Sequence, residues 1–262
     1  MEKAVFISDI DNLQYIKTGY SRIYFGNEFC QNLIPAIEDI KKALDFTTET
    51  KMRFSFVTPY INDDGLDKIS KLLSYIKTAL PSSEVIINDW GILRRINREF
   101  PELEPVLGRL LTKQKKGPRI MTIKKRVPNN TIEHFKQTNA DSTATSDFLI
   151  KNRIHRIELD NLLQGISRPR PVLSASLYIP FAYITTSRYC LTRMAFNDEK
   201  FTRSITGCKR ECRISTFKLS HRQMPADIYL KGNTQFLQNS DIPDNLEELK
   251  IDRLVFEPTL PM

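Results

Sequence analysis

The chain has 262 residues, of which 40% are hydrophobic, and a formal net charge of +8 at pH 7. This length suits one large domain or two small ones. No apolar run approaches the roughly 20 residues that a membrane-spanning helix needs, and the N-terminal segment lacks the small-residue cleavage site of a secretory signal. We therefore expect a soluble, cytoplasmic protein without a membrane span, in which metal binding or catalysis explains the cysteines better than disulfides do.

The N-terminal part of the chain alternates short apolar runs with amphipathic segments. The runs predict strands over Ala4–Ser8, Arg22–Phe25, Phe54–Val57 and Glu84–Ile87. Apolar residues at helical spacing between them predict helices over Asp9–Tyr20, Leu33–Phe46, Leu66–Leu80 and from Trp90 to about Glu99. Asn62 or Asp63 can cap the third helix, which Pro81 ends.

The alternation continues less regularly toward the C-terminus. Further strands are predicted over Pro105–Leu111, His155–Leu159, Val172–Tyr178, Asp227–Lys231 and Arg253–Phe256, and further helices over Ser142–Asn152 and Asn245–Lys250. Strands and helices that alternate at this spacing indicate a parallel sheet with helices outside it. We expect an α/β fold, a (β/α)8-like (TIM-type) barrel that its long connections leave incomplete or distorted, built as a single domain over residues 1–262. A doubly wound open sheet is the alternative.

One segment accounts for the whole surplus of positive charge. Eight lysines and arginines and no acidic residue lie between Arg109 and Arg126. Such a run predicts either a solvated basic loop or a contact with an anionic partner, and RNA could bind through Lys113–Arg126. No aromatic residue interrupts the run, which argues against a surface that stacks single-stranded bases.

Four cysteines are the candidate functional residues. Cys30 follows the second predicted strand, whereas Cys190, Cys208 and Cys212 lie in the long segment after the seventh. In a barrel of this type, the loops that follow the C-terminal ends of the strands meet at one face. We therefore expect the four thiols to converge at this mouth of the barrel.

Four thiolates suit either a zinc ion or an iron–sulfur cluster. Structural zinc sites commonly use two close pairs of ligands, whereas this chain has one pair, Cys208 and Cys212, and two dispersed cysteines. This arrangement favours a cluster, with zinc and ordinary structural cysteines as the other interpretations. The cations beside the cysteines in the sequence could stabilise a negatively charged cluster; they are Arg188, Lys209, Arg210 and Arg213.

Two other cysteine chemistries fit less well. Cys208 and Cys212 begin the C-x-x-x-C-x-x-C pattern of radical S-adenosylmethionine enzymes, but Ser215 stands at the third position. A cysteine nucleophile needs a histidine partner, and the three histidines have no local signature; they are His134, His155 and His221. We expect His155 to be structural, while His221 could lie near the cysteines.

Several segments resemble the collagenase-like peptidase U32 family. They are RIYFGNEFC (22–30), SEVIINDWGILRRI (83–96), FAYITTSRYCLTR (181–193), GCKRECR (207–213) and DIYLKGNTQFLQ (227–238). The resemblance is strongest to the iron–sulfur accessory proteins of oxygen-independent ubiquinone biosynthesis. It implies that the four cysteines are the ligands of a [4Fe–4S] cluster. It leaves the catalytic residues unknown.

The same resemblance implies a function. The chain would be the cluster-binding component of an oxygen-independent hydroxylation system that acts on a small molecule or quinone precursor, together with a paralogous U32-family protein. Other members resemble RNA-modifying factors that use prephenate in hydroxylation, so an RNA-modification factor is one alternative, and a U32-type peptidase is another. The chain departs from that subgroup in its longer spacing from Cys190 to Cys208 and in its basic segment, and it lacks the wider family's longer peptidase-like signature, in which a Glu-x-Phe occurs with closely spaced cysteines.

Overall fold

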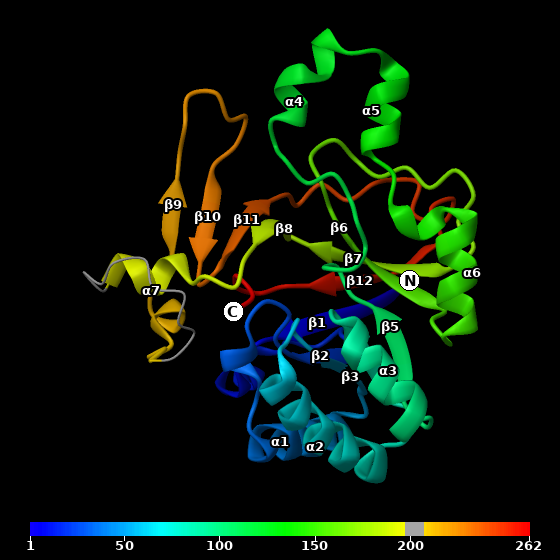
Figure 1. Cartoon of the computed structure of the whole chain (residues 1–262), viewed down its shortest axis with the longest axis vertical. Coiled ribbons are helices and arrows are strands. Elements are labelled where there is room, and N and C mark those ends of the chain that lie inside the picture. Colours follow the sequence, from blue (N-terminus) through cyan, green and yellow to red (C-terminus); the bar gives the residue numbers. More distant parts are fainter. Residues whose placement is uncertain (197–206) are drawn as a thin grey trace.

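The computed structural model describes residues 1–196 and 207–262, and its centre is a closed barrel of parallel strands (Figure 1). The strands occur around the barrel in the order β1-β12-β7-β6-β5-β4-β3-β2. Their bounds are β1 Glu2–Ile7, β2 Arg22–Gly26, β3 Arg53–Val57, β4 Glu84–Ile87, β5 Glu104–Leu107, β6 Arg156–Asp160, β7 Ser174–Ile179 and β12 Ile251–Phe256. The expected TIM-type barrel is confirmed, and the open sheet is wrong because β12 pairs with both β1 and β7.

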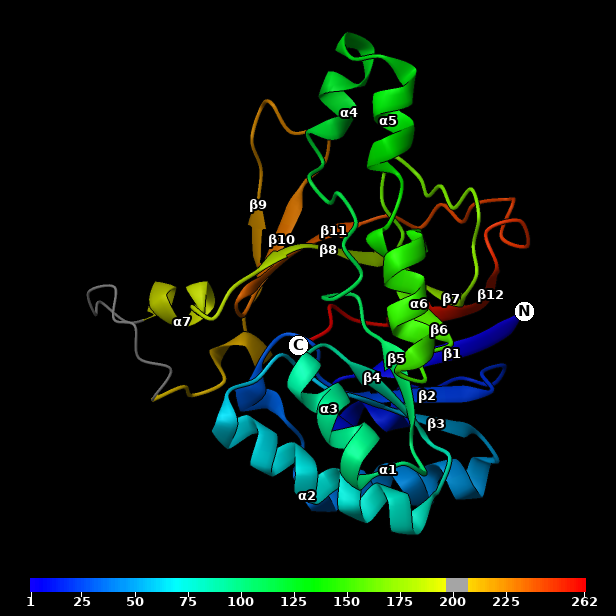
Figure 2. The same cartoon turned by 45° about the vertical axis from the view of Figure 1, so that its right-hand side comes forward.

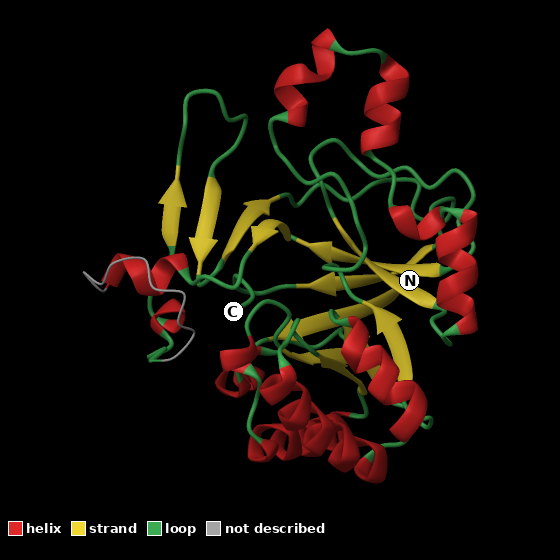
Figure 3. Cartoon of the chain, viewed as in Figure 1, coloured by secondary structure: helices red, strands yellow, loops and turns green. Residues whose placement is uncertain are grey.

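Helices cover part of the outside of the barrel (Figure 3), in the connections that follow β2, β3, β4 and β5. The longer ones are α1 Ile37–Thr50, α2 Asp63–Ala79, α3 Trp90–Glu99 and α6 Thr143–Lys151. Asn62 caps α2 by accepting a hydrogen bond from the Gly65 amide at 3.0 Å, and Asp89 caps α3 in the same way. The apolar faces of these helices pack on the outward-facing side chains of the strands, such as Ile23 and Val85.

The barrel interior is partly polar. A small apolar cluster that includes Tyr24, Val57 and Tyr178 fills its middle. The rings of Tyr24 and Tyr178 meet edge to face with centroids 6.0 Å apart. Glu158 is fully buried beside them, and accepts hydrogen bonds from the hydroxyls of Tyr24 and Ser176.

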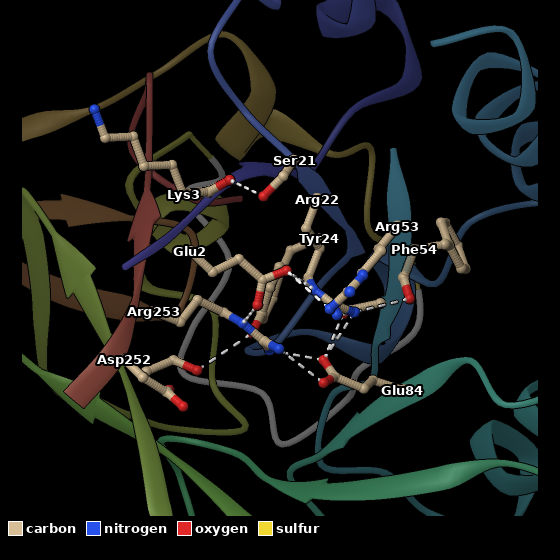
Figure 4. A network of polar contacts seen from close by, with 12 residues as sticks. Glu2, Lys3, Ser21, Arg22, Tyr24, Arg53, Phe54, Glu84, Asp252 and Arg253 are labelled. Atoms are coloured by element: carbon tan, nitrogen blue, oxygen red, sulfur yellow. Dashed lines mark hydrogen bonds and ion pairs between the residues drawn. The ribbon is translucent and has the colours of Figure 1, made fainter. Parts of the chain in front are cut away.

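An ion network closes the base of the barrel, where the strands begin (Figure 4). Arg253 donates to both carboxylate oxygens of Glu84, at 2.7 and 2.9 Å, and to Glu2 at 2.6 Å. Arg22 contacts the same two carboxylates, Glu2 at 2.8 Å and Glu84 at 3.1 Å. Burial opposes ionisation of Glu2 and Glu84, but the arginines outweigh it and hold the pKa of each carboxyl below its ordinary value.

A second sheet leaves the barrel after β7. It is antiparallel, has the order β8-β11-β10-β9, and consists of β8 Phe181–Thr186, β9 Phe217–Leu219, β10 Ile228–Lys231 and β11 Thr234–Gln238. The short helix α7 (Leu191–Phe196) and the 3-10 helix η5 (Glu211–Arg213) belong to the same excursion. The strand predicted at Asp227–Lys231 therefore exists, but it belongs to this sheet and not to the barrel.

A helical arm lies between β5 and β6. It comprises α4 Ile120–Ile123, η3 Lys124–Arg126, α5 Asn129–Phe135 and η4 Asn139–Asp141. The arm projects away from the barrel in both views (Figures 1 and 2). In the described ranges, no helix has the length and apolar content that crossing a membrane requires.

Four predicted elements differ from the structure. The helix expected over Asp9–Tyr20 is only the 3-10 helix η1 (Ile10–Tyr15), and Asn245–Lys250 forms turns. The helix expected from Leu33 starts at Ile37, because Pro35 disfavours helical geometry in the residue before it and leaves only the turn η2 (Gln31–Leu33).

The fourth difference concerns Pro105–Leu111, where β5 ends at Leu107. Gly108 then lies against the Asn88 side chain, and a Cβ there would come within 2.2 Å of the Asn88 amide oxygen. That oxygen accepts a hydrogen bond from the Leu110 amide at 3.0 Å. The chain therefore turns after β5 instead of extending the strand, and the turn carries Arg109.

Candidate functional site

The four cysteines come from loops at the C-terminal end of the barrel. Cys30 follows β2, in a turn where the side-chain oxygen of Asn27 accepts hydrogen bonds from the backbone amides of Phe29 and Cys30. Cys190 directly precedes α7, and its sulfur accepts a hydrogen bond from the Arg193 amide at 3.4 Å. All four thiols are free, so the structure contains them as separate groups and not as disulfides.

The thiols lie close enough to influence one another. Burial raises the pKa of Cys30 to about 12, and the other three cysteines add to the shift. Burial, then Cys190 and Cys208, raise the pKa of Cys212 to about 11. Within residues 1–196 and 207–262, however, no three histidine, cysteine, aspartate or glutamate side chains converge closely enough to hold a metal ion. The four cysteines are therefore neighbours at the mouth but do not form a set of ligands there, and their role as ligands stays a prediction.

The cysteine site has a largely apolar environment. Cys212 is 4% exposed and belongs to a cluster with Phe29, Phe236 and Met262, against which Cys30 also packs. Gly232 adopts φ +62°. A Cβ added at this position would lie 3.3 Å from the Cβ of Cys212. A side chain at Gly232 would also collide with Met262, so this turn between β10 and β11 needs glycine.

The cations near the cysteines are only partly those expected. Arg213 pairs with Asp9 at 3.3 Å, and Arg188 donates to the Ile61 carbonyl at 3.2 Å. Lys231, which was not singled out from the sequence, is a partly buried cation near the cysteines: burial lowers its pKa, and Cys212 acts in the opposite direction. Its position on β10 next to Gly232 could have been noticed only after β10 was placed beside the cysteines.

A second constellation lies inside the mouth and centres on Arg109, which is fully buried. Its guanidinium contacts Glu28, Asp160 at 3.1 Å and Glu257 at 2.7 Å, and it lies 3.7 Å from the centre of the Tyr178 ring. It also donates to the Phe181 carbonyl at 3.0 Å. One arginine therefore ties together the ends of β2, β6 and β12 and the start of β8.

Lys116 joins the constellation through Asp160. Its ammonium group pairs with the Asp160 carboxylate and lies 3.8 Å from the centre of the Tyr183 ring. Burial lowers the pKa of Lys116 to about 8, although Asp160 opposes the shift. Three carboxyl groups therefore share two cations, and full ionisation would leave an excess negative charge in a buried site.

The pKa values of the carboxyl groups reflect this excess of negative charge. Burial raises the pKa of Glu28, and it raises the pKa of Glu257 well above its ordinary value, with Arg109 opposing both shifts. One Glu257 oxygen is buried with no hydrogen-bond partner in the described part of the chain. Buried carboxyl groups whose pKa is raised in this way are typical of functional sites.

This constellation is not evident from the sequence, in which Arg109 and Lys116 belong to a run of cations that predicts a solvated basic loop or a contact with an anionic partner. The prediction of a solvated loop is wrong for these two residues: Arg109 is fully buried and Lys116 is 9% exposed. Their cationic neighbours Lys124 and Lys125 are exposed. Position carries the missing signal, because Glu28, Arg109 and Asp160 each stand at or within two residues of the end of a barrel strand.

The histidines lie away from both constellations. His134 on α5, His155 before β6 and His221 between β9 and β10 are all exposed. The Nδ1 of His221 accepts a hydrogen bond from the Gln223 amide at 3.2 Å. His155 was expected inside a strand, and it instead precedes β6.

Comparison with known proteins gives a likeness of fold. No family model and no curated protein matches the sequence. A solved structure described as that of the U32 peptidase Mk0906 is similar to this chain with a TM-score of 0.50 and 9% sequence identity, over 100% of this chain and 94% of that one. This chain therefore resembles, in its overall fold, a protein described as a U32 peptidase.

Proposed function

We propose that this chain binds a [4Fe–4S] cluster and acts as the cluster-bearing component of an oxygen-independent hydroxylation system. One observation carries the proposal. Four free thiols, which the sequence separates by up to 182 residues (Cys30 to Cys212), lie near one another at one end of the barrel, and burial together with the neighbouring cysteines raises the pKa of Cys30 and Cys212. Cys30, Cys190, Cys208 and Cys212 would each give a thiolate ligand.

The chemistry of the donor set fits a cluster. Four thiolates are the usual ligands of a [4Fe–4S] cluster, and such a cluster accepts ligands from dispersed loops. The apolar neighbours Phe29, Phe236 and Met262 would shield it from water, and Lys231 would offset part of its negative charge. When bound, the cluster would supply electron transfer. A zinc ion is the alternative occupant of the same thiolates.

The hydroxylation role follows from the resemblance of the cysteine segments to the accessory proteins of oxygen-independent ubiquinone biosynthesis. Under that reading the substrate is a small molecule or quinone precursor, and the partner is a paralogous protein of the same family. The fold likeness to a U32 peptidase supports a second candidate, a peptidase. An RNA-modification factor would use the exposed cations of the helical arm, such as Lys124 and Lys125.

Anaerobic purification followed by iron and sulfide analysis tests the cluster. We expect about four iron and four sulfide ions per chain, with a brown colour from thiolate-to-iron transitions. Cys30→Ala should lower both contents, whereas Ser215→Ala, a control near the cysteines in sequence, should leave them unchanged. Stoichiometric zinc without iron would refute the cluster, and cleavage of unfolded peptides by the metal-free protein would favour the peptidase.

A further inference from the structure

The mouth of the barrel contains a cavity of about 790 Å³ that the cysteines do not occupy. Its walls come from the connection after β3, the turn after β5 with the segment that follows it, and β8 with the residues after it. The volume falls within the range of small-molecule sites, which is roughly 300–1,000 Å³. The cavity is therefore large enough for a metabolite, and it lies where TIM-type barrels bind their ligands.

The charged side chains that line this cavity all have the same sign. They are Lys113, Lys115, Lys116 and Arg188. Lys116 is neutralised by Asp160, but among the described residues no carboxylate pairs with the other three. Lys113 donates to the Leu110 carbonyl at 3.0 Å, and Lys115 lies 5.9 Å from the centre of the Phe135 ring. A concave surface with several uncompensated cations and no acidic lining residue attracts anions.

The uncharged part of the lining combines apolar and aromatic residues with polar ones, which are Asn88, Gln114, Thr185, Thr186 and Ser187. Leu110, Leu111 and Ile184 contribute aliphatic surface. Tyr60 and Tyr183 contribute rings, and Tyr183 is held rigidly because its hydroxyl donates to the Arg109 carbonyl at 2.9 Å. A bare inorganic ion would leave this surface in contact with water, whereas an organic skeleton would cover it.

We propose that this cavity binds a small organic anion, a carboxylate carried on an apolar or aromatic skeleton. The carboxylate would be held by Lys115 and Arg188 at the open side, and the skeleton would lie against Tyr60 and Tyr183. This site is distinct from the cysteines and does not depend on what they bind. It does adjoin them: Tyr60 packs against the same apolar cluster as Cys30, and its hydroxyl accepts a hydrogen bond from Asn233 at 3.0 Å.

Isothermal titration calorimetry on the full chain tests the proposal. The probes are benzoate, 3-phenylpropionate and succinate, with neutral benzamide and inorganic phosphate as comparisons. We expect at least one aromatic carboxylate to bind with a Kd below about 10 mM and benzamide to bind at least about tenfold more weakly, since it lacks the charge. Succinate and phosphate should bind more weakly than that carboxylate because they cover less apolar surface.

Matched substitutions locate the binding. Lys115→Gln and Arg188→Gln together should weaken carboxylate binding by about tenfold or more. Lys124→Gln with Lys125→Gln removes the same charge from exposed positions outside the cavity and should change the Kd by less than about twofold. Circular dichroism confirms that both double variants are folded.

Any one of four titration results would overturn the proposal. They are the absence of binding by every carboxylate, equal binding of benzoate and benzamide, equal weakening by the two double variants, and phosphate binding that excludes the carboxylates. A short single-stranded RNA that binds more tightly than the carboxylates and displaces them would also overturn it, because the cavity would then be part of a nucleic-acid surface.

Discussion

The barrel carries a buried ion network at each end, and the two networks differ in how their charges are balanced. At the base, Glu2 and Glu84 each contact both Arg22 and Arg253 (Figure 4). At the mouth, three carboxyl groups share Arg109, and Lys116 pairs with one of them. The base therefore has one guanidinium for each carboxylate, while the mouth has more carboxyl groups than cations.

The pKa shifts follow this balance and not the depth of burial alone. Burial disfavours the charged carboxylate at both ends, yet the pKa falls for Glu2 and Glu84 and rises for Glu28 and Glu257. The base can remain fully ionised, which suits a network that fixes the strands. At the mouth, full ionisation of the three carboxyl groups would be unfavourable, because their negative charges outnumber the cations. A buried site that keeps such an imbalance beside a cavity is better explained by function than by stability.

Removing Arg109 should have the largest effect. Arg109→Met leaves Glu28 and Glu257 buried without their cation, and we expect a loss of about 3–5 kcal/mol in the free energy of unfolding. Arg22→Met at the base should cost less, because Glu2 and Glu84 both keep Arg253. Urea denaturation at pH 7 measures both variants. An equal loss at the two positions would show that the charge imbalance at the mouth has no energetic consequence.

The pH dependence of stability separates the two kinds of carboxyl group. Burial raises the pKa of Glu158, in the barrel interior, to about 7, with Arg253 opposing the shift. The unfolded chain releases this proton near the ordinary value of 4.5, so the folded state loses stability as pH rises from about 4.5 to 7. The lowered pKa of Glu2 and Glu84 acts oppositely, since their contribution is lost as pH falls through the folded values.

Glu158→Gln should remove the loss that occurs as pH rises. Between pH 5 and pH 7.5, the wild-type free energy of unfolding should fall by up to about 3 kcal/mol relative to that of the variant. Denaturation curves at several pH values measure the difference. Parallel pH profiles of the two proteins would mean that Glu158 ionises normally in the folded chain.

A pair of isosteric substitutions sharpens the comparison further. Glu84→Gln removes a carboxylate that two arginines stabilise, and should cost about 1–3 kcal/mol at pH 7. Glu257→Gln replaces a carboxyl group whose ionised form burial disfavours, so that its pKa is raised, and it should change stability by less than about 1 kcal/mol. Urea denaturation measures both. The reverse ranking would contradict the assignment of the mouth as the strained end.

Much of the barrel could be predicted from the sequence, because buried parallel strands appear as short apolar runs and because Asn62 and Asp89 cap helices in a recognisable way. The convergence of the cysteines also followed, since Cys30 stands after β2 and the others after β7. The strands of the second sheet could not be predicted in the same way. Only one residue, Pro180, separates β7 from β8, and β9 is a short, largely exposed strand with no apolar alternation to mark it.

The ion network at the mouth escaped prediction for a different reason. Charge counted along the sequence does not show which way a side chain points, so Arg109 and Lys116 resembled the exposed cations that follow them. Their burial depends on partners far away in the chain, such as Glu257, which lies 148 residues after Arg109. Such contacts become visible only when the order of the strands around the barrel is known.

The smallest effect is expected at the other end of the same basic segment. Lys124 and Lys125 lie in the projecting arm and are exposed, so replacing both with Gln should change the free energy of unfolding by less than about 0.5 kcal/mol. The segment would then contain both the most and the least sensitive positions of the comparison.

If the arm binds RNA, the same variant should instead weaken that binding and lower its salt slope by about two, since each lysine that contacts a phosphate contributes about one. Filter binding of a single-stranded RNA at two salt concentrations measures this slope. An unchanged slope together with unchanged stability would leave the arm as a solvated surface and restrict the functional cations of the segment to those that turn into the mouth.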